Sequence, residues 1–202
     1  MITAQDKILH VANKLGLTSL KDMQASTGAV YDVDTDRSGQ LFLNATRHAN
    51  PSVTNLTENQ FEVNEALLVE TVAFYIRDSS NNFIFNLQQV LGSSAVIVFD
   101  LIIGNKRVIK DTPIFAPGSP YTFANVGATN TVVGAAQVNA FVPRHQIFME
   151  GAGILIPPQV QYNVQYSIFD IVTGAVLTLP ESQDIGCYLF GTKVLLNFNT
   201  TI

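Results

Sequence analysis

The stretch 151–166 constrains the fold more than any other part of the chain. After Pro157 and Pro158, the residues alternate between apolar and polar side chains. A period of two is typical of a β-strand with one buried and one solvated face. The prolines have no backbone N–H to donate, so they can lie only at a strand end or at a corner of a sheet. We therefore expect strands over 153–156 and 160–170, joined by the corner of a two-sheet sandwich or by an ordinary bent hairpin.

Further strands are predicted from apolar runs and from the turn residues between them. The run Phe61–Arg77 is apolar on both parities, which predicts a strand that is buried on both faces or bent partway. Gly104 and Asn105 predict a hairpin that joins strands over 95–103 and 107–109.

The last part of the chain predicts a short strand over Ala175–Leu179 and a long one over Ile185–Phe198. Gly186 and Gly191 are the expected bulge points of the long strand. With about eight to ten strands and almost no helix after residue 28, the chain is expected to be all-β, either a sandwich or a barrel.

The only helical pattern lies within residues 1–28, where apolar residues recur at helical spacing. Gly16 is placed to end a first helix, and Ser19 with Asp22 indicates a second short one. A segment this short is not stable alone, so its apolar stripe is expected to pack on the body, on a neighbouring molecule or on a membrane surface. The stripe comprises Ile8, Val11, Leu15, Leu17 and Leu20.

The segment Asp32–Gly39 resembles the start of a calcium-binding loop, with acidic residues at alternate positions. Arg37 stands where such a loop needs glycine, and Leu43 stands where it needs a bidentate glutamate. We therefore expect a solvated acidic turn. Together with the helical segment it forms an N-terminal arm, residues 1–38, that precedes the β-sandwich, residues 39–202.

Only 13% of the 202 residues are charged, against a usual figure of about 25%. Charged residues are depleted at the centres of protein interfaces, so this composition favours a building block of an assembly over a neutral, Asn-rich monomer. The net charge of −5 provides no basic surface, and no direct binding to nucleic acid is expected. We also expect neither a signal peptide nor a transmembrane helix.

The sequence offers no catalytic set. The three histidines show no metal-ligand spacing, and neither a nucleophile elbow nor a phosphate-binding loop is present. The carboxylates Glu62, Glu65 and Glu70 fit the solvated face of a strand. Cys187 lies in an apolar run and is expected to be a small buried hydrophobe. We therefore predict no enzyme, no cofactor and no catalytic, cofactor-binding or metal-binding residues.

Two phrases carry a resemblance to a known family: the polar loop leading into a strand over Asn55–Val69, and the corner and strand over Gly153–Val164. With a helical arm at one end and a final strand at the other, they resemble the upright jelly-roll capsid proteins of tailless icosahedral phages that contain an internal membrane. Double-roll coats of this family need about twice the β content seen here. The resemblance therefore implies a single jelly-roll sandwich of about eight strands, of the coat or penton type.

The same resemblance implies a structural virion protein that builds an icosahedral shell by self-association and is assembled in the host cytoplasm. Its expected partners are further copies of itself, other capsid proteins and, through the arm, an underlying membrane surface. The apolar stripe from Ile8 to Leu20 would then be the subunit or shell contact. Deleting residues 1–28 is expected to leave a folded β domain that assembles poorly.

An alternative function is a lectin-like or receptor-binding sandwich, such as a spike or an adhesin. The long excursion over 111–140 would supply its exposed binding loop, because long loops are often functional. Tyr121 and Phe123 are the candidate ligand-binding residues of that loop.

Overall fold

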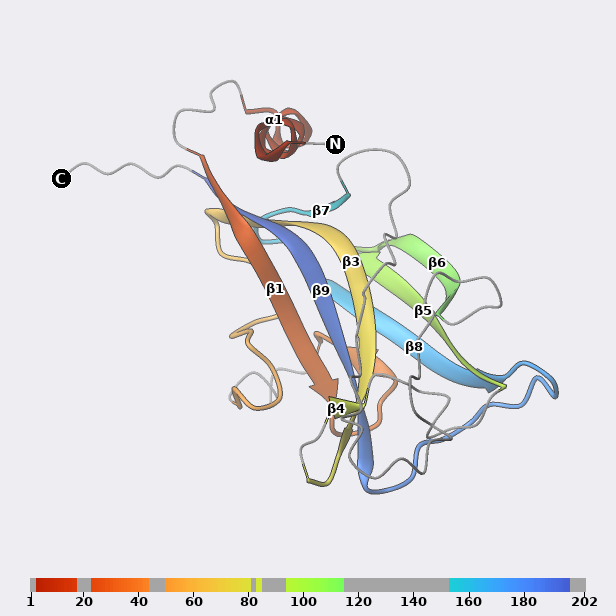
Figure 1. Ribbon diagram of the computed structural model, residues 1–202. Coiled ribbons are helices and arrows are strands. Elements are labelled where there is room, and N and C mark those ends of the chain that lie inside the picture. The colour runs from red at the N-terminus through yellow and green to blue at the C-terminus, as the bar shows by residue number, and fades with distance from the viewer. Residues whose placement is uncertain are drawn as a thin grey trace, which may run out of the picture.

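The computed structural model describes residues 3–17, 23–43, 50–80, 83–84, 94–114 and 153–196. These residues form one helix and nine strands (Figure 1). In chain order the elements are α1 (Ala4–Leu15), β1 (Gln24–Asp34), β2 (Gln40–Leu41), β3 (Glu65–Asp78), β4 (Phe83–Ile84), β5 (Ala95–Ile103), β6 (Lys106–Ile114), β7 (Ile154–Ile156), β8 (Tyr162–Asp170) and β9 (Gln183–Leu195).

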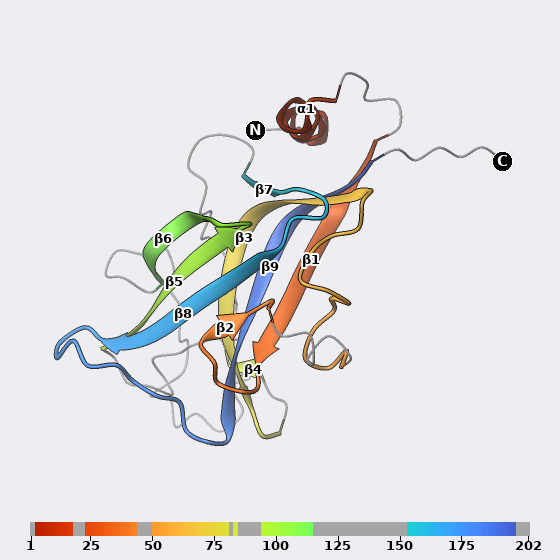
Figure 2. The ribbon, with the colours of Figure 1, turned by 180° about the vertical axis from the view of Figure 1, so that it is seen from behind.

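The strands form two antiparallel sheets that pack face to face (Figures 1 and 2). The five-stranded sheet has the order β1-β9-β3-β4, with β7 also pairing with β3, and the four-stranded sheet has the order β2-β8-β5-β6. The core lies between them and contains buried residues of both, among them Val72 and Phe74 of β3 and Phe99 and Leu101 of β5. The predicted all-β sandwich is therefore confirmed.

The strand pattern around the two prolines is confirmed in detail. β7 pairs with β3 in the five-stranded sheet, whereas β8 lies in the four-stranded sheet between β2 and β5. The chain thus crosses from one sheet to the other at Pro157 and Pro158, as expected of a sandwich corner. In β8 the side chains of Tyr162 and Val164 are buried, and that of Gln165 is exposed.

The long strand β3 is both buried on two faces and interrupted by a bulge. Leu67 faces the core between the sheets, while Leu68 faces a second cluster on the outside. The register with β9 shifts between Val69 and Thr71, so Glu70 is an extra residue in the ladder. Gly191 lies opposite this bulge, and a Cβ there would come within 1.9 Å of the Leu68 carbonyl oxygen. The bulged strand is therefore β3, and Gly191 is the residue of β9 opposite the bulge rather than the bulge point that was predicted.

Gly186 has a different role from the expected one. The register between β3 and β9 is regular at this position, so Gly186 is not a bulge point. A Cβ on Gly186 would instead lie 2.1 Å from the ring of Tyr75. The glycine leaves room for that ring, which packs on Val33, Val53 and Tyr188 on the outer face of the sheet.

Helix α1 begins and ends at capping residues that satisfy its terminal backbone groups. At the start, the Thr3 hydroxyl accepts from the Asp6 N–H, and the Asp6 carboxylate accepts from the Thr3 N–H at 2.8 Å. The Thr3 hydroxyl also donates to the Asp6 carboxylate at 2.7 Å, and this bond, together with that from the Thr3 N–H, lowers the pKa of Asp6. Gly16 ends the helix in the left-handed conformation, as predicted, with φ of 69°.

The helix packs on the outer face of its own five-stranded sheet (Figure 1). Val11 is fully buried against Leu68 and Val194, and an ion pair of 2.6 Å joins Lys7 to Glu70. Val11 is therefore covered by its own chain, and the expectation that it contacts a neighbour is wrong. The expectation failed because the outer face of the sheet gives the helix an apolar surface of its own chain to pack on, although the helix belongs to neither sheet.

The expected N-terminal arm, residues 1–38, contains a complete strand of the sandwich, β1, all of which pairs with β9. Gln24–Gly28 are not helical but form the start of β1, and they pair with residues 191–195 of β9. Deleting residues 1–28 would thus remove five residues of β1 as well as the helix. We therefore no longer expect this deletion to leave an intact β domain. The strand predicted over Ala175–Leu179 is also wrong, because only an isolated bridge from Val176 to Phe169 forms there.

The loop before β3 covers part of the edge of β1. The Asn55 side-chain oxygen accepts from the Tyr31 N–H at 2.9 Å, and its amide nitrogen donates to the Ala29 carbonyl at 2.8 Å. The Asn55 N–H donates to the Tyr31 carbonyl at 3.4 Å. One asparagine thus replaces a neighbouring strand along this segment, which protects the edge from pairing with other chains.

Candidate functional site

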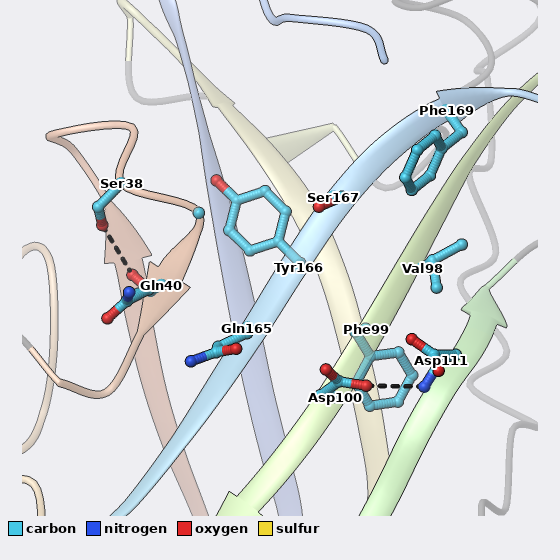
Figure 3. A pocket seen from close by; sticks show the side chains of 11 residues that line it. Ser38, Gln40, Val98, Phe99, Asp100, Asp111, Gln165, Tyr166, Ser167 and Phe169 are labelled. Carbon is cyan, nitrogen blue, oxygen red and sulfur yellow. Dashed lines mark hydrogen bonds between the residues drawn. The ribbon is translucent and has the colours of Figure 1, made fainter. Parts of the chain in front are cut away.

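A pocket of about 300 Å³ lies on the outer face of the four-stranded sheet. Outward-facing side chains of β8 and β5 form its floor (Figure 3). The turn from Ser38 to Gln40 forms one wall, and Asp111 of β6 forms the other. The pocket thus spans all four strands of this sheet, and its lining includes Phe99, a residue of the core.

Strand register places the polar groups of the pocket in one row. Gln40 of β2 pairs with Gln165 of β8, and Gln165 pairs with Asp100 of β5. Asp111 follows on β6, where the register with β5 shifts between Phe99 and Leu101. Two amides and two carboxylates therefore lie side by side across the sheet.

A second row carries smaller and less polar groups. Ser167 of β8 pairs with Val98 of β5, and Phe169 of β8 lies one step further along the strand (Figure 3). The pocket therefore has a larger polar part and a smaller apolar part.

Contacts within the sheet hold the two carboxylates in place. Asp100 accepts from the Asp111 N–H at 2.7 Å and forms an ion pair with Arg107. Arg107 also contacts Asp111 at 3.2 Å, and Asp111 has a φ of 45° in the register shift of β6. The positive guanidinium partly neutralises the carboxylates, so the pocket combines fixed acceptors with little net charge.

The turn that forms one wall is held by a buried carboxylate. Asp34 is fully buried at the end of β1 and accepts from the Gly39 N–H and the Tyr166 hydroxyl, both at 2.8 Å. Asp34 also accepts from Ser38, and buried Asp32 accepts from the Phe42 N–H at 2.6 Å. This network ties the turn to β8 and so positions the wall of the pocket.

The acidic segment is therefore different from the solvated turn that was expected. Asp36 and Arg37 are exposed, but Asp32 and Asp34 are buried structural acceptors. No group of three or more metal-ligating side chains occurs in the part of the chain that the structure describes. Alternating acidic residues on a strand did not reveal the roles of Asp32 and Asp34, because burial depends on the neighbouring sheet.

The residues predicted to be functional are not brought together at this pocket. Leu15 and Leu17 are partly buried beside Val11 on the five-stranded sheet, and Ile8 is half-buried on the same helix. Leu20, Tyr121 and Phe123 lie outside the described residues. The sequence analysis did not predict the pocket residues as a site, because only the strand register brings them into line. The alternating polar residues of β8 were the one feature of the sequence that pointed to this face.

Cys187 is buried in the core, as predicted. Burial raises the pKa of its thiol well above the ordinary value, and the negative charge of Asp32 adds to the effect. Glu70, assigned above to a solvated strand face, is instead half-buried between Lys7 and the Thr192 hydroxyl, which donates to it at 2.7 Å.

Comparisons with known proteins return no relatives of this chain. No family model, no curated protein and no solved structure matches it. Among the described residues, no helix has both the length and the apolar character needed to span a membrane.

Proposed function

We propose that the sandwich is a single jelly roll. A jelly roll is an antiparallel ribbon of eight strands rolled into two sheets, in which the first strand pairs with the last, the second with the seventh, and so on inwards. If the two-residue strand β4 is left out, eight strands remain. Their pairings β1·β9, β2·β8, β3·β7 and β5·β6 follow this rule.

The division of the strands between the sheets supports the same topology. One sheet then has the order β1-β9-β3-β7 and the other the order β2-β8-β5-β6. Each ribbon pair thus stays within one sheet, and successive pairs alternate between the sheets. The helix α1 and the strand β4 are additions to this plan.

We propose that the protein is a structural virion protein, a capsid subunit of the coat or penton type that acts by self-association without a catalytic step. The strand order described above is the observation that carries this proposal. The low fraction of charged residues supports it, because wide protein–protein contacts favour such a composition. Other copies of the chain and further capsid proteins would be its partners, and the virion its location.

The loop after β8 supplies a surface suited to such contacts. Ile171, Val172 and Val176 are 53%, 80% and 67% exposed there. The Val172 N–H donates to the Asp170 carboxylate at 2.8 Å, which lowers the pKa of Asp170 and keeps the loop in one conformation. Three exposed aliphatic side chains on one ordered loop are a surface that suits a protein–protein contact.

Sedimentation velocity at increasing concentrations of the purified chain tests the proposal. Self-association predicts species larger than a monomer whose share grows with concentration. A single monomeric species at every concentration, in the presence and absence of salt, would contradict a shell-building role.

A further inference from the structure

We propose that the pocket on the outer face of the four-stranded sheet binds a neutral saccharide. This inference does not rest on the proposed capsid role, because it concerns a site within one subunit. It also differs from the loop containing Tyr121 and Phe123, which the sequence had suggested as a ligand-binding loop.

The chemical groups of the pocket select the class of ligand. Asp100 and Asp111 carry two negative charges that would repel an anion, and Arg107, which contacts both, neutralises one of them and so weakens the attraction for a cation. A neutral molecule with several hydroxyl groups fits this arrangement, since each hydroxyl can donate to a carboxylate and accept from an amide.

Two side chains of the floor are available to such a ligand. Gln165 and Ser167 are exposed, and neither side chain is hydrogen-bonded to any other residue within the described part of the chain. They come from alternate positions of β8, so both point to the outer face. In Figure 3, Gln165 lies between Gln40 and Asp100, and Ser167 lies further along β8 toward Phe169.

The apolar part of the pocket fits the remaining surface of a sugar. Val98 and Phe169 line the side away from the carboxylates (Figure 3). A sugar ring carries C–H groups on its faces and hydroxyl groups at its edge, so it can contact both parts at once. The volume of about 300 Å³ lies at the lower end of the range for small-molecule sites, which favours a ligand of one or two sugar units.

The site is also preorganised. Asp100 is fixed by Arg107 and by the Asp111 N–H, and the turn is fixed by Asp34. Groups that are held before binding lose little conformational freedom when a ligand arrives. The pocket can therefore bind without a change of fold.

Binding of the full-length chain to an array of neutral and anionic saccharides tests this inference, with affinities of the bound sugars measured by titration calorimetry. We expect at least one neutral saccharide to bind. Gln165→Ala should weaken that binding by about five- to tenfold through the lost hydrogen bonds. Ser167→Trp should abolish it by filling the pocket.

Gln161→Ala is the matched control, because Gln161 is an exposed glutamine that lies just before β8 and outside the pocket. It should bind as the wild type does, and thermal unfolding should show that all three variants are folded. The inference is overturned if no neutral saccharide binds, if only anionic saccharides bind, or if binding survives both pocket substitutions. Saccharide binding and self-association are measured by different experiments, so failure of this inference leaves the test of the capsid proposal by sedimentation unchanged.

Discussion

At the scale of single residues, glycine positions show where the strands leave no room for a side chain. Gly191 and Gly174 make a contrasting pair. A Cβ on Gly191 would meet the backbone of β3, whereas nothing lies within 4 Å of a Cβ on Gly174, which has φ of 70°. The sequence marked Gly191 as a bulge but could not reveal the close approach, because that depends on the partner strand.

Gly191→Ala is expected to lower the free energy of unfolding by at least about 3 kcal/mol, because backbone atoms cannot rotate away from the added methyl group. Gly174→Ala should cost only about 1–2 kcal/mol, from the left-handed conformation alone. Urea unfolding of both variants checks this. Equal losses in the two variants would contradict the close packing at the bulge.

Cys187 is expected to resist modification in the folded protein. Because burial raises its pKa, the thiol stays protonated in the native state when the unfolded thiol, with an ordinary pKa of 9.0, has ionised. The unfolded state then binds fewer protons, so this residue should make stability fall as the pH rises above that value. Thiol labelling at pH 8 with and without denaturant checks the burial; equally fast labelling of both states would contradict it.

At the scale of elements, segments with a clear side-chain periodicity could be predicted from the sequence, and segments without one could not. The alternation of β8, and the helical spacing and terminal Gly16 of α1, are local patterns, and both elements were predicted correctly. No part of β1 was predicted: Asp32–Asp34 were interpreted as an acidic turn, and Gln24–Gly28 contain small and polar residues without alternation. Their strand conformation comes from pairing with β9, which no local pattern encodes.

The packing of α1 is expected to contribute measurably to the stability of the sandwich. Val11→Ala should lower the free energy of unfolding by about 2 kcal/mol, since Val11 is fully buried against the sheet. Leu9→Ala on the same helix should change it by less than about 0.5 kcal/mol, because Leu9 is 46% exposed. Thermal or urea unfolding distinguishes them, and an unaffected Val11→Ala variant would show that the helix does not dock.

At the scale of the whole molecule, the fold class was predictable but the strand order was not. The number and spacing of strands indicated a sandwich. The pairing of β1 with β9 joins segments at opposite ends of the described chain, and only tertiary contacts determine it. The pocket shares this limitation, since its polar row exists only through the register of four strands.

The exposed loop after β8 provides a test of the proposed contacts. Val172→Asp is expected to shift sedimentation towards smaller species, because a charge would have to be buried in any contact that covers this loop. Gln161→Glu adds the same charge at an exposed position outside the loop and should assemble normally. Unchanged assembly of Val172→Asp would exclude the loop as a contact.

Electron cryomicroscopy of the assembled chain tests the central claim most directly, at a resolution that separates strands about 4.8 Å apart. We predict closed particles with point-group symmetry, in which each subunit has the strand orders β1-β9-β3-β7 and β2-β8-β5-β6. The absence of closed particles, or subunits with a different strand order, would contradict the proposal of a shell-building jelly roll.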